Sequence, residues 1–336
     1  MRRRTKWLIA AASTLVLLIF FGIFAYLEWE PGRHFRPQQL PVLVAPQKAV
    51  GMLQAGSPLG EQANSAAEPS APSQAESLKL DGFNLLLLGI DARGAESSRT
   101  DVLMLIHVDP ELRKVRLLSI PRDTRVQLPG IGYTKINHAH ILGERKSGSH
   151  AGTEAALQAV SNLCSCKINY YVKTDFAGFE RFVDKIGGLD LELDEPVTLT
   201  YAQQTLPKGE VHLNGETALH FVRERRSLPG GDQGRQEHQA QALKALINKL
   251  LEPRNLLRIK PLIEEIREDL VDTNLEDGDL VSLAWLAKDL KGNHLSYDQL
   301  PGEGKRAWDP MVKAELYYWV PDMTEWEKLR KAYSVR

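Results

Sequence analysis

RTDVLMLIHVDPELRKVRLLSIPRDTR, at residues 99–125, is the stretch that decides the fold of this chain. It contains two apolar runs, 102–108 and 115–120, separated by the polar turn sequence DPELRK. Short apolar runs bounded by turn residues are typical of strands that are buried on both faces. A third run of this kind, FNLLLLGI at residues 83–90, comes shortly before them. The three runs predict buried strands with polar residues at their ends.

Helical and extended patterns alternate after this stretch. Asp175 is placed to cap a helix that Gly187 and Gly188 end, because a carboxylate accepts from free N–H groups and glycine tolerates a left-handed backbone. Alternation of strands and helices favours the α/β class, with an α-β-α layered sheet. The predicted helices are 153–163, 176–186, 236–251, 260–270, 278–290 and 322–333, the last capped by Asp322, and the further strands are 168–172, 189–193 and 295–300.

The N-terminus carries a membrane signal. Residues 8–27 contain no ionisable charge, and a helix of about 20 apolar residues can cross a bilayer. Arg2, Arg3, Arg4 and Lys6 precede this run, and such cations are typical of the cytoplasmic side. We interpret the run as an uncleaved signal anchor with the rest of the chain outside the cytoplasm. A cleaved signal peptide is the alternative, although the run is long and no A-x-A pattern follows it.

The chain is therefore divided by sequence into four parts. Residues 28–80 are rich in Pro, Ala, Gln, Ser and Gly, which is typical of an extended spacer that lifts a domain off the membrane. The predicted parts are a cytoplasmic tail (1–7), a transmembrane signal anchor (8–27), an extracytoplasmic linker (28–80) and one catalytic domain (81–336), whose core motifs lie in 83–251 and whose C-terminal helical extension is 252–336.

Composition excludes several function classes. The 336 residues carry a net charge of −1, and without the four N-terminal cations the remainder carries −5, which does not favour a nucleic-acid binder. Two cysteines, Cys164 and Cys166, cannot form a disulfide scaffold, and they are expected to be a structural disulfide or buried thiols. No P-loop, G-x-S-x-G or H-E-x-x-H motif is present, so nucleotide hydrolysis, serine acyl transfer and zincin chemistry lack support.

Arginines and aspartates gather at the predicted strand ends. Arginine binds phosphate through paired donors and stays charged, whereas carboxylates at a strand end can hold Mg²⁺ beside phosphate oxygens. Together they suit phosphoryl transfer, in which a protein mainly positions and neutralises its substrate. Ordinary surface ion pairs are the alternative for any single residue. The residues are Asp91, Arg99, Asp101, Arg122, Asp123, then Arg223 and Arg225 in an i, i+2 relation, and Asp232, Arg235 and Gln236 at the start of a long helix.

The chain resembles the LytR-CpsA-Psr family of cell-wall assembly proteins in several motifs that occur in the family's order. These motifs are GIDAR, SSRTDVLMLIHVDP, VRLLSIPRDTRVQLPGIGYTKIN, YYVKTDFAGFERFVDKIGGLDLEL, LNGETALHFVRERR and GDQGRQEHQ. The resemblance implies a membrane-anchored phosphotransferase that moves a glycopolymer, such as a teichoic acid or a capsular polysaccharide, from an undecaprenyl pyrophosphate carrier to a sugar hydroxyl of peptidoglycan.

The resemblance also implies roles for individual residues. It assigns Asp91 and Asp101 to a bound Mg²⁺, with Mn²⁺ as a substitute, and Asp91 is our first choice for activating the acceptor hydroxyl. It places Arg99, Arg122, Arg223, Arg225 and Arg235 in a pyrophosphate clamp, and Asp91, Arg99, Asp101, Arg122 and Arg225 among the catalytic residues. Asp123, Asp232 and Gln236 are assigned supporting positions.

Two other functions remain open at this point. A polyprenyl pyrophosphate hydrolase would use water in place of the sugar hydroxyl, and a non-catalytic envelope protein would bind the polyprenyl lipid or act in regulation without chemistry. The motif after Arg235 departs from the family, which often has a second Arg-Gln where this chain reads Glu237-His238-Gln239. His238 could replace that missing cation only in part, since histidine is mostly neutral at pH 7.

Overall fold

The computed structural model describes residues 2–36, 38–47, 82–91, 99–256, 258–267, 272–288, 290 and 294–333. A six-stranded mixed sheet forms its centre, in the order β11-β6-β1-β2-β3-β12. The strands of this sheet are β1 (Phe83–Asp91), β2 (Arg99–Asp109), β3 (Lys114–Ser119), β6 (Tyr170–Asp175), β11 (Asp272–Thr273) and β12 (Leu295–Gln299).

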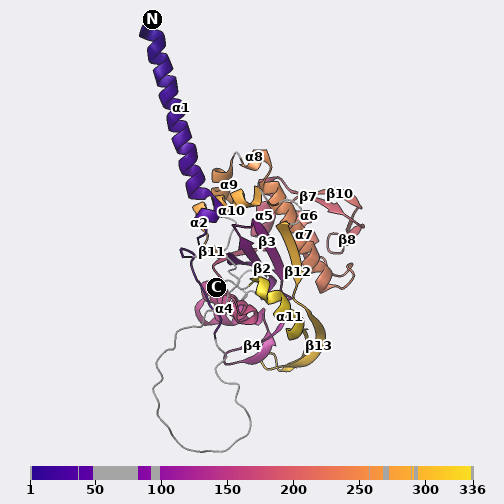
Figure 1. Ribbon diagram of the computed structural model, residues 1–336. Helices are drawn as coiled ribbons and strands as arrows, with labels where there is room; N and C mark the ends of the chain where they lie inside the picture. Colours follow the sequence, from indigo (N-terminus) through magenta and orange to yellow (C-terminus); the bar gives the residue numbers. More distant parts are fainter. Residues whose placement is uncertain are drawn as a thin grey trace, which may run out of the picture.

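Helices and smaller strand pairs surround this sheet (Figure 1). The helices are α1 (Arg2–Trp29), α2 (Pro31–His34), α3 (His138–Ser147), α4 (Ser149–Cys164), α5 (Phe176–Ile186), α6 (Gly215–Arg223), α7 (Asp232–Leu250), α8 (Pro253–Leu256), α9 (Ile259–Arg267), α10 (Asp277–Lys288), α11 (Met323–Arg330) and the short 3-10 helix η2 (Lys331–Tyr333). The remaining strands are β4 (Arg125–Leu128), β5 (Gly132–Lys135), β7 (Leu189–Leu193), β8 (Val197–Leu199), β9 (Gln204–Leu206), β10 (Gly209–Leu213), β13 (Gly302–Asp309) and β14 (Ala314–Pro321).

The strand directions bring the charged ends together. β1 runs parallel to β6 and antiparallel to β2, and β2 runs antiparallel to β3. The ends of β1, β3 and β6 therefore meet the beginning of β2 at one edge of the sheet. Asp91, Arg99 and the Arg122 segment lie at this edge, which we call the charged edge. The remainder of the GIDAR motif, after Asp91, lies outside the described residues.

A β-bulge re-aims Asp101. Gly89 pairs with Val102, whereas Ile90 pairs with Thr100, so Asp101 is the extra residue on β2. Side chains alternate between the faces of a strand, and a bulge interrupts this alternation. Asp101 and its neighbour Val102 consequently both line the cavity described below.

Apolar clusters cover both faces of the sheet, which confirms the predicted α-β-α layers. On one face, Leu86, Leu103 and Leu118 pack against α3, α4 and α11. On the other face, Leu85 and Met104 belong to a cluster that includes residues of α7 and α10. A further cluster joins α5, α6 and α7 to the small β7-β10 sheet. Cys164 and Cys166 form a buried disulfide in the first of these clusters.

The segment after the anchor packs on the domain, so its interpretation as a free spacer is wrong for residues 30–47. Phe35 is 3% exposed and its ring lies 4.4 Å from the ring of Phe83. His34 Nε2 lies 2.9 Å from a carboxylate oxygen of Asp279 on α10, and Val44 bridges to Ile168. We call residues 30–47 the collar. The proline-rich composition of the collar suggests a spacer. The collar is nevertheless ordered on the domain, because its few large apolar side chains are buried there. Residues 48–80 of the predicted linker lie outside the described residues.

The C-terminal part is not a purely helical extension. The predicted helices appear as α9, α10 and α11, and Asp322 caps α11 by accepting from the N–H groups of Thr324 and Glu325. However, β11 and β12 complete the central sheet, and β13 and β14 form an antiparallel hairpin. LYYWV at residues 316–320 has the aromatic and β-branched composition of a strand, although no strand was predicted there.

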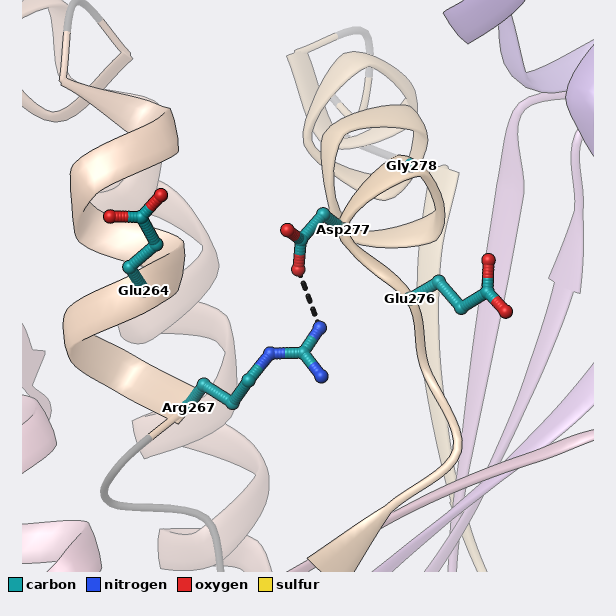
Figure 2. Close-up of a pocket in the computed structure, with 5 residues that line it drawn as sticks. All are labelled: Glu264, Arg267, Glu276, Asp277 and Gly278. Carbon is teal, nitrogen blue, oxygen red and sulfur yellow. Dashed lines mark hydrogen bonds and ion pairs between the residues drawn. The ribbon is translucent and has the colours of Figure 1, made fainter.

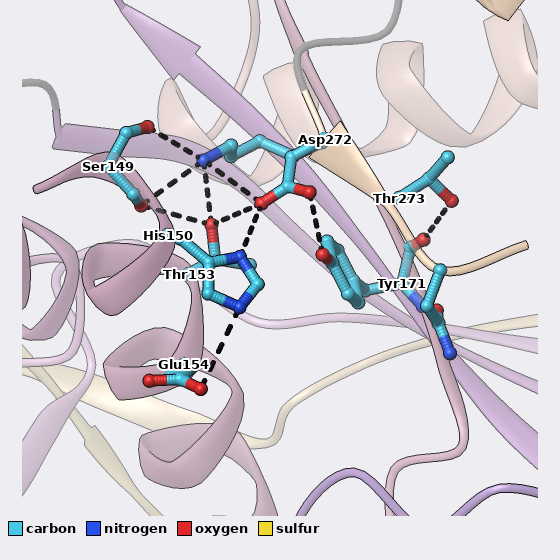
Figure 3. A network of polar contacts seen from close by, with 9 residues as sticks. Ser149, His150, Thr153, Glu154, Tyr171, Asp272 and Thr273 are labelled. Atoms are coloured by element: carbon cyan, nitrogen blue, oxygen red, sulfur yellow. Dashed lines mark hydrogen bonds and ion pairs between the residues drawn. The ribbon is translucent and has the colours of Figure 1, made fainter.

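A polar network connects β11, an outermost strand of the sheet, to β6 and α4 (Figure 3). Lys173 is fully buried and donates to Thr153 Oγ1 at 2.6 Å, which links β6 to α4. Asp272 accepts from the Tyr171 hydroxyl at 2.7 Å and lies 3.8 Å from the Lys173 ammonium group. Burial lowers the pKa of Lys173, against the effect of Asp272. Lys173 and Tyr171 belong to the face of the sheet opposite the cavity, so we assign this network a structural role.

Candidate functional site

A cavity of about 550 Å³ lies between the sheet and helices α5, α7 and α10. Along β1 its lining changes from Leu85 and Leu87 to Asp91 at the charged edge. Most of the other lining residues are apolar, and they come from the strands β1, β2 and β6, from the three helices, and from α6 and α9. Six charged residues other than Asp175 line the cavity: Asp91, Asp101, Arg122, Arg223, Arg225 and Arg235. Five of these six residues, all but Asp91, come from segments other than β1, so the fold assembles them from distant parts of the chain.

The apolar part of the cavity lies toward the anchor. The collar packs against Phe83 at the beginning of β1, and Arg113 in the β2–β3 turn lies 3.9 Å from Glu30. Both contacts are at the end of the sheet opposite Asp91. Figure 1 shows α1 leaving the molecule beside α2 and α10, with α9 and α8 nearby. A strand of nine residues spans about 30 Å, so the charged edge stands roughly that far from the anchor end.

Arg122 and Asp101 form an ion pair in which Arg122 Nη1 lies 2.5 Å from Asp101 Oδ1. Burial alone lowers the pKa of Arg122, but Asp101, Asp123 and Asp232 together raise it. Arg122 Nε is buried and has no hydrogen-bond partner among the described residues. A charged donor without a partner beside an open cavity is suited to receive an anionic oxygen.

Arg235 is the most buried of the five arginines at 6% exposed, and its Nη2 lies 2.7 Å from Asp232 Oδ1. Burial lowers its pKa; Asp232 and Asp101 oppose this effect, and the positive charges of Arg122 and Arg225 add to it. The three guanidinium groups are therefore close enough to repel one another. The Nε atom of Arg235 also lacks a hydrogen-bond partner in the described part of the chain. An anion bound between these groups would relieve the repulsion.

Arg223 and Arg225 line the same cavity but do not lie on a strand, so the predicted strand relation between them is wrong. Arg223 is the last residue of α6, and its guanidinium carbon lies 4.2 Å from the centre of the Phe176 ring. Glu224 then turns the chain into an extended conformation that leads to Arg225. The sequence LNGETALHFVR has apolar residues at helical spacing after an asparagine that can cap a helix. In the structure Asn214 does cap α6, accepting from the N–H of Thr217. Those signals could have identified the helix.

The remaining predicted site residues, Arg99, Asp123 and Gln236, lie around the cavity and do not line it. Arg99 is paired with Asp91 across β1 and β2, but it is exposed and is not among the cavity-lining residues. Asp123 accepts from Lys135 Nζ at 2.7 Å, and its contact with Arg122 Nε is longer at 4.0 Å. Gln236 donates to Asp232 at 3.1 Å and thus helps to fix the carboxylate that holds Arg235.

The chain is similar over most of its length to proteins of a known family. The model of the LytR_cpsA_psr family matches residues 52–334. The chain belongs to this family. It is 34% identical over 254 residues to the polyisoprenyl-teichoic acid–peptidoglycan teichoic acid transferase TagU of Bacillus anthracis, covering 75% of this chain and 78% of the relative. It is 33% identical over 264 residues to TagV of Bacillus subtilis, with coverage of 76% and 64%.

Solved structures of family members have the same fold. The crystal structure of B. subtilis TagV superposes with a TM-score of 0.64 at 31% identity, covering 76% of this chain and 96% of TagV. A structure of TagT bound to LIIa-WTA superposes with a TM-score of 0.61 at 27% identity, covering 75% of this chain and 89% of that one. The family resemblance and the α/β fold expected from the sequence are thereby confirmed.

Glu224 is a site residue of this family member that sequence reasoning missed. It is 1% exposed, and its carboxylate accepts from the N–H groups of Thr200, Arg225 and Arg226 at 2.5, 2.9 and 2.7 Å. Burial alone raises the pKa of Glu224, but the hydrogen bonds from Thr200, Ser227 and Arg226 outweigh this effect and lower it. The carboxylate therefore fixes the backbone that carries Arg223 and Arg225. In the sequence Glu224 stands among arginines, where it resembles a surface ion pair.

Replacing Glu224 with glutamine should destabilise the domain at neutral pH by roughly 1–3 kcal/mol, since buried donors lose a charged acceptor. Because the pKa of Glu224 is lower in the folded state than in the unfolded chain, its carboxylate stabilises the fold at pH values above the unfolded pKa of 4.5. This stabilisation is lost as the pH falls through the pKa of the folded state. The difference between wild type and variant should therefore shrink in acid. Urea unfolding of the full chain at about pH 7 and about pH 3 measures it. Glu216→Gln, on the exposed side of α6, is the control, and an equal loss at both pH values would contradict the assignment.

His238 does not replace the second cation of the family motif. Its ring stacks on Phe221 with centroids 4.0 Å apart, and Nδ1 lies 3.2 Å from the Phe221 carbonyl oxygen. Burial lowers the pKa of His238, although the Phe221 carbonyl and Glu224 oppose the shift, so the ring is neutral at pH 7. The adjacent Gln239 lines the cavity and donates to the Val222 carbonyl oxygen at 3.2 Å.

Asp91 and Asp101 could hold a divalent cation. Both line the charged end of the cavity on adjacent strands. No group of three or more His, Cys, Asp or Glu side chains with metal-binding geometry occurs among the described residues. Mg²⁺ needs no such cage, because it keeps several waters and takes one or two carboxylates together with substrate phosphate oxygens. The donor set therefore fits Mg²⁺ in the presence of a pyrophosphate.

A second hollow of about 730 Å³ lies between α9 and α10, and it differs chemically from the cavity (Figure 2). Its lining consists of Glu264, Arg267, Glu276, Asp277 and Gly278. Arg267 Nη2 lies 2.5 Å from Asp277 Oδ1, and both side chains are largely exposed. An exposed pair of this kind contributes little energy, and the hollow has no apolar wall for a lipid. We therefore place the functional site in the cavity that ends at the charged edge.

Proposed function

We propose that this chain is a membrane-anchored phosphotransferase that moves a teichoic-acid-type glycopolymer from an undecaprenyl pyrophosphate carrier to a sugar hydroxyl of peptidoglycan. One observation carries the proposal: a long apolar cavity that ends in four arginines and two aspartates. An apolar wall suits a polyprenyl tail, and converging arginines suit the pyrophosphate at its end. The names of the relatives TagU and TagV describe a transfer of this kind.

In this proposal the arginines neutralise and position the pyrophosphate. Arg122, Arg225 and Arg235 bind its oxygens, and Arg223 and Arg99 flank them. The acceptor hydroxyl attacks the phosphorus that carries the glycopolymer, the bond from that phosphorus to the bridging oxygen breaks, and polyprenyl phosphate leaves. The hydroxyl proton passes to a carboxylate, with Asp91 as our choice. Asp123, Asp232 and Gln236 hold the arginines or their neighbours in place.

Asp91 and Asp101 would hold Mg²⁺, or Mn²⁺ in its place. The cation would supply positive charge to phosphate oxygens beside the arginines. Asp101 already contacts Arg122, so it would link the metal to the clamp.

Reconstitution tests the proposed function. The full chain in lipid vesicles, with a polyprenyl pyrophosphate glycopolymer and uncrosslinked peptidoglycan, should yield polymer-linked muropeptides detectable by mass spectrometry. A chelator should stop the reaction, Mg²⁺ or Mn²⁺ should restore it, and Asp101→Asn should raise the Mg²⁺ concentration for half activity roughly tenfold. Glu303→Gln, an exposed carboxylate on β13, is the control. Release of the polymer to water would instead indicate a hydrolase, and full activity in excess chelator would exclude the metal role.

The anchor gives the expected location. Residues Ala11–Trp29 of α1 form a helix long and apolar enough to cross a membrane, and none of them is buried in the domain. With four cations before it, we expect the N-terminus in the cytoplasm and the domain outside. A periplasm-dependent or surface-dependent reporter fused after Arg336 should be active, and the same reporter before Met1 should be silent. A soluble product that begins near residue 28 would show cleavage and contradict an anchor.

A further inference from the structure

The β13–β14 hairpin lies at the end of the molecule away from α1 (Figure 1), and two of its aromatic side chains are exposed to solvent. Trp308 is 58% exposed and Tyr317 is 45% exposed. Residues paired across an antiparallel hairpin share a face, and Tyr317 pairs with Arg306 while Trp308 pairs with Glu315. Both aromatic rings therefore lie on the same face. Exposed aromatic side chains that gather in this way mark a binding surface more often than a packing defect.

Glycines make this face flat. A methyl group added at Gly304 would stand 2.7 Å from Cε2 of Tyr317, so the tyrosine ring lies directly over the glycine. A methyl group at Gly302 would stand 2.7 Å from Nε1 of Trp319 in the same way. Any side chain at these two positions would lift the rings off the strand. The rings instead lie along the hairpin, and strand geometry spaces successive positions on one face by about 7 Å.

The opposite face fixes the hairpin to the domain. Asp309 is fully buried and accepts from Thr134 Oγ1 at 2.7 Å and from the Tyr318 hydroxyl at 2.6 Å. Its other oxygen accepts from the N–H groups of Met311 and Val312, both at 2.8 Å. The aromatic face is thus held on a rigid support and is not a mobile loop.

The face also continues into the candidate site. The N–H of Trp319 donates to the carbonyl oxygen of Asp123 at 2.9 Å, and Thr124 forms a bridge with Trp319, so the hairpin is attached to the segment that carries Arg122. Partial burial raises the pKa of Tyr317, and the charges of Asp123 and Asp232 raise it further.

We propose that Trp308, Tyr317 and Gly304 form the binding site for the sugar chain of the acceptor. The occupant is a glycan of linked pyranose rings, whose C–H faces stack on the exposed aromatic rings beside the segment that the hairpin binds at Asp123. The proposal rests on the proposed function, because it identifies this glycan with the acceptor. The donor enters from the anchor end of the sheet and the acceptor binds at the opposite end, so both reach the charged edge without crossing.

Binding and transfer are measured separately to test this site. The binding probe is a soluble peptidoglycan glycan fragment added to the full chain in detergent, followed by tryptophan fluorescence and by calorimetry. Wild type should bind, and Tyr317→Ala and Trp308→Ala should each weaken binding roughly tenfold. Gly304→Val should do the same without removing an aromatic ring. Tyr133→Ala, which removes a tyrosine that is 52% exposed on β5, is the matched control and should bind normally.

Transfer assays give the second readout. The hairpin variants should raise KM for the acceptor with little change in kcat, and their binding of a polyprenyl pyrophosphate without polymer should equal that of wild type. Equal glycan affinity in wild type and both aromatic variants would overturn the site. Weaker binding of the donor glycopolymer in place of the peptidoglycan fragment would overturn its assignment to the acceptor. Glycan binding without any transfer would instead contradict the proposed function and leave the surface in place.

Discussion

Replacing Arg235 with alanine should lower the rate of transfer by a factor on the order of 10²–10³, which is typical for the loss of one preorganised donor. Arg235 is buried, Asp232 holds its guanidinium, and its Nε has no hydrogen-bond partner among the described residues. Its interaction with a pyrophosphate is strongest when negative charge grows on the phosphoryl oxygens. The loss should therefore appear in kcat more than in KM for the donor.

Two variants separate this effect from a general loss of positive charge. Arg235→Lys should recover only part of the rate, because an ammonium group cannot reproduce the paired donors of a guanidinium. Arg330→Ala, in a surface pair with Glu327, should leave the rate unchanged. Thermal unfolding should show that Arg235→Ala stays folded, since the variant also removes repulsion from Arg122 and Arg225. A rate within threefold of wild type would contradict a clamp that includes Arg235.

Filling the apolar part of the cavity should lower kcat/KM for long polyprenyl donors by nearly as much as Arg235→Ala lowers the rate of transfer. Ala284 on α10 lines the cavity, and Ala284→Trp would place within it an indole that is larger than one five-carbon isoprene unit. At about 0.8 kcal/mol for each methylene-sized group excluded, the loss of four such groups costs up to roughly 3 kcal/mol. The kcat/KM for a long polyprenyl donor should then fall by a factor on the order of 10².

The length of the lipid distinguishes this effect from damage to the charged edge. A donor with a tail of two or three isoprene units should be used equally well by wild type and Ala284→Trp. Leu112→Trp, at a position that is 59% exposed in the β2–β3 turn, is the control and should behave as wild type with both donors. An equal fall in kcat/KM for short and long donors would show that the cavity does not hold the tail.

Much of the fold could be predicted from local patterns. The helix Phe176–Ile186 follows from its Asp175 cap and from Gly187, which has a φ of 87°. The central strands follow from apolar runs with polar ends. The approach of Asp91 to the Arg122 segment then needs only neighbouring strands of alternating direction.

Other features depend on contacts that local patterns do not contain. The bulge that turns Asp101 into the cavity arises from pairing with β1, and T-D-V has no sign of it. The burial of Phe35 depends on Phe83, far along the chain. Glu224 resembles a surface charge until its backbone donors are seen. The hairpin at 302–321 is different, because the strand-favouring composition of LYYWV at 316–320 is a local signal.

The collar has a consequence for how far this protein can work from the membrane. Gln47 and Gly82 are both held by the same domain, Gln47 through Asn162 and Gly82 through the start of β1. The number of residues between them therefore cannot set the height of the charged edge. The distance from the end of α1 to the charged edge is determined by one sheet length, because the collar holds α1 directly on the domain. With α1 as the proposed membrane anchor, a wall polymer would have to approach the membrane surface to within this fixed distance to be modified.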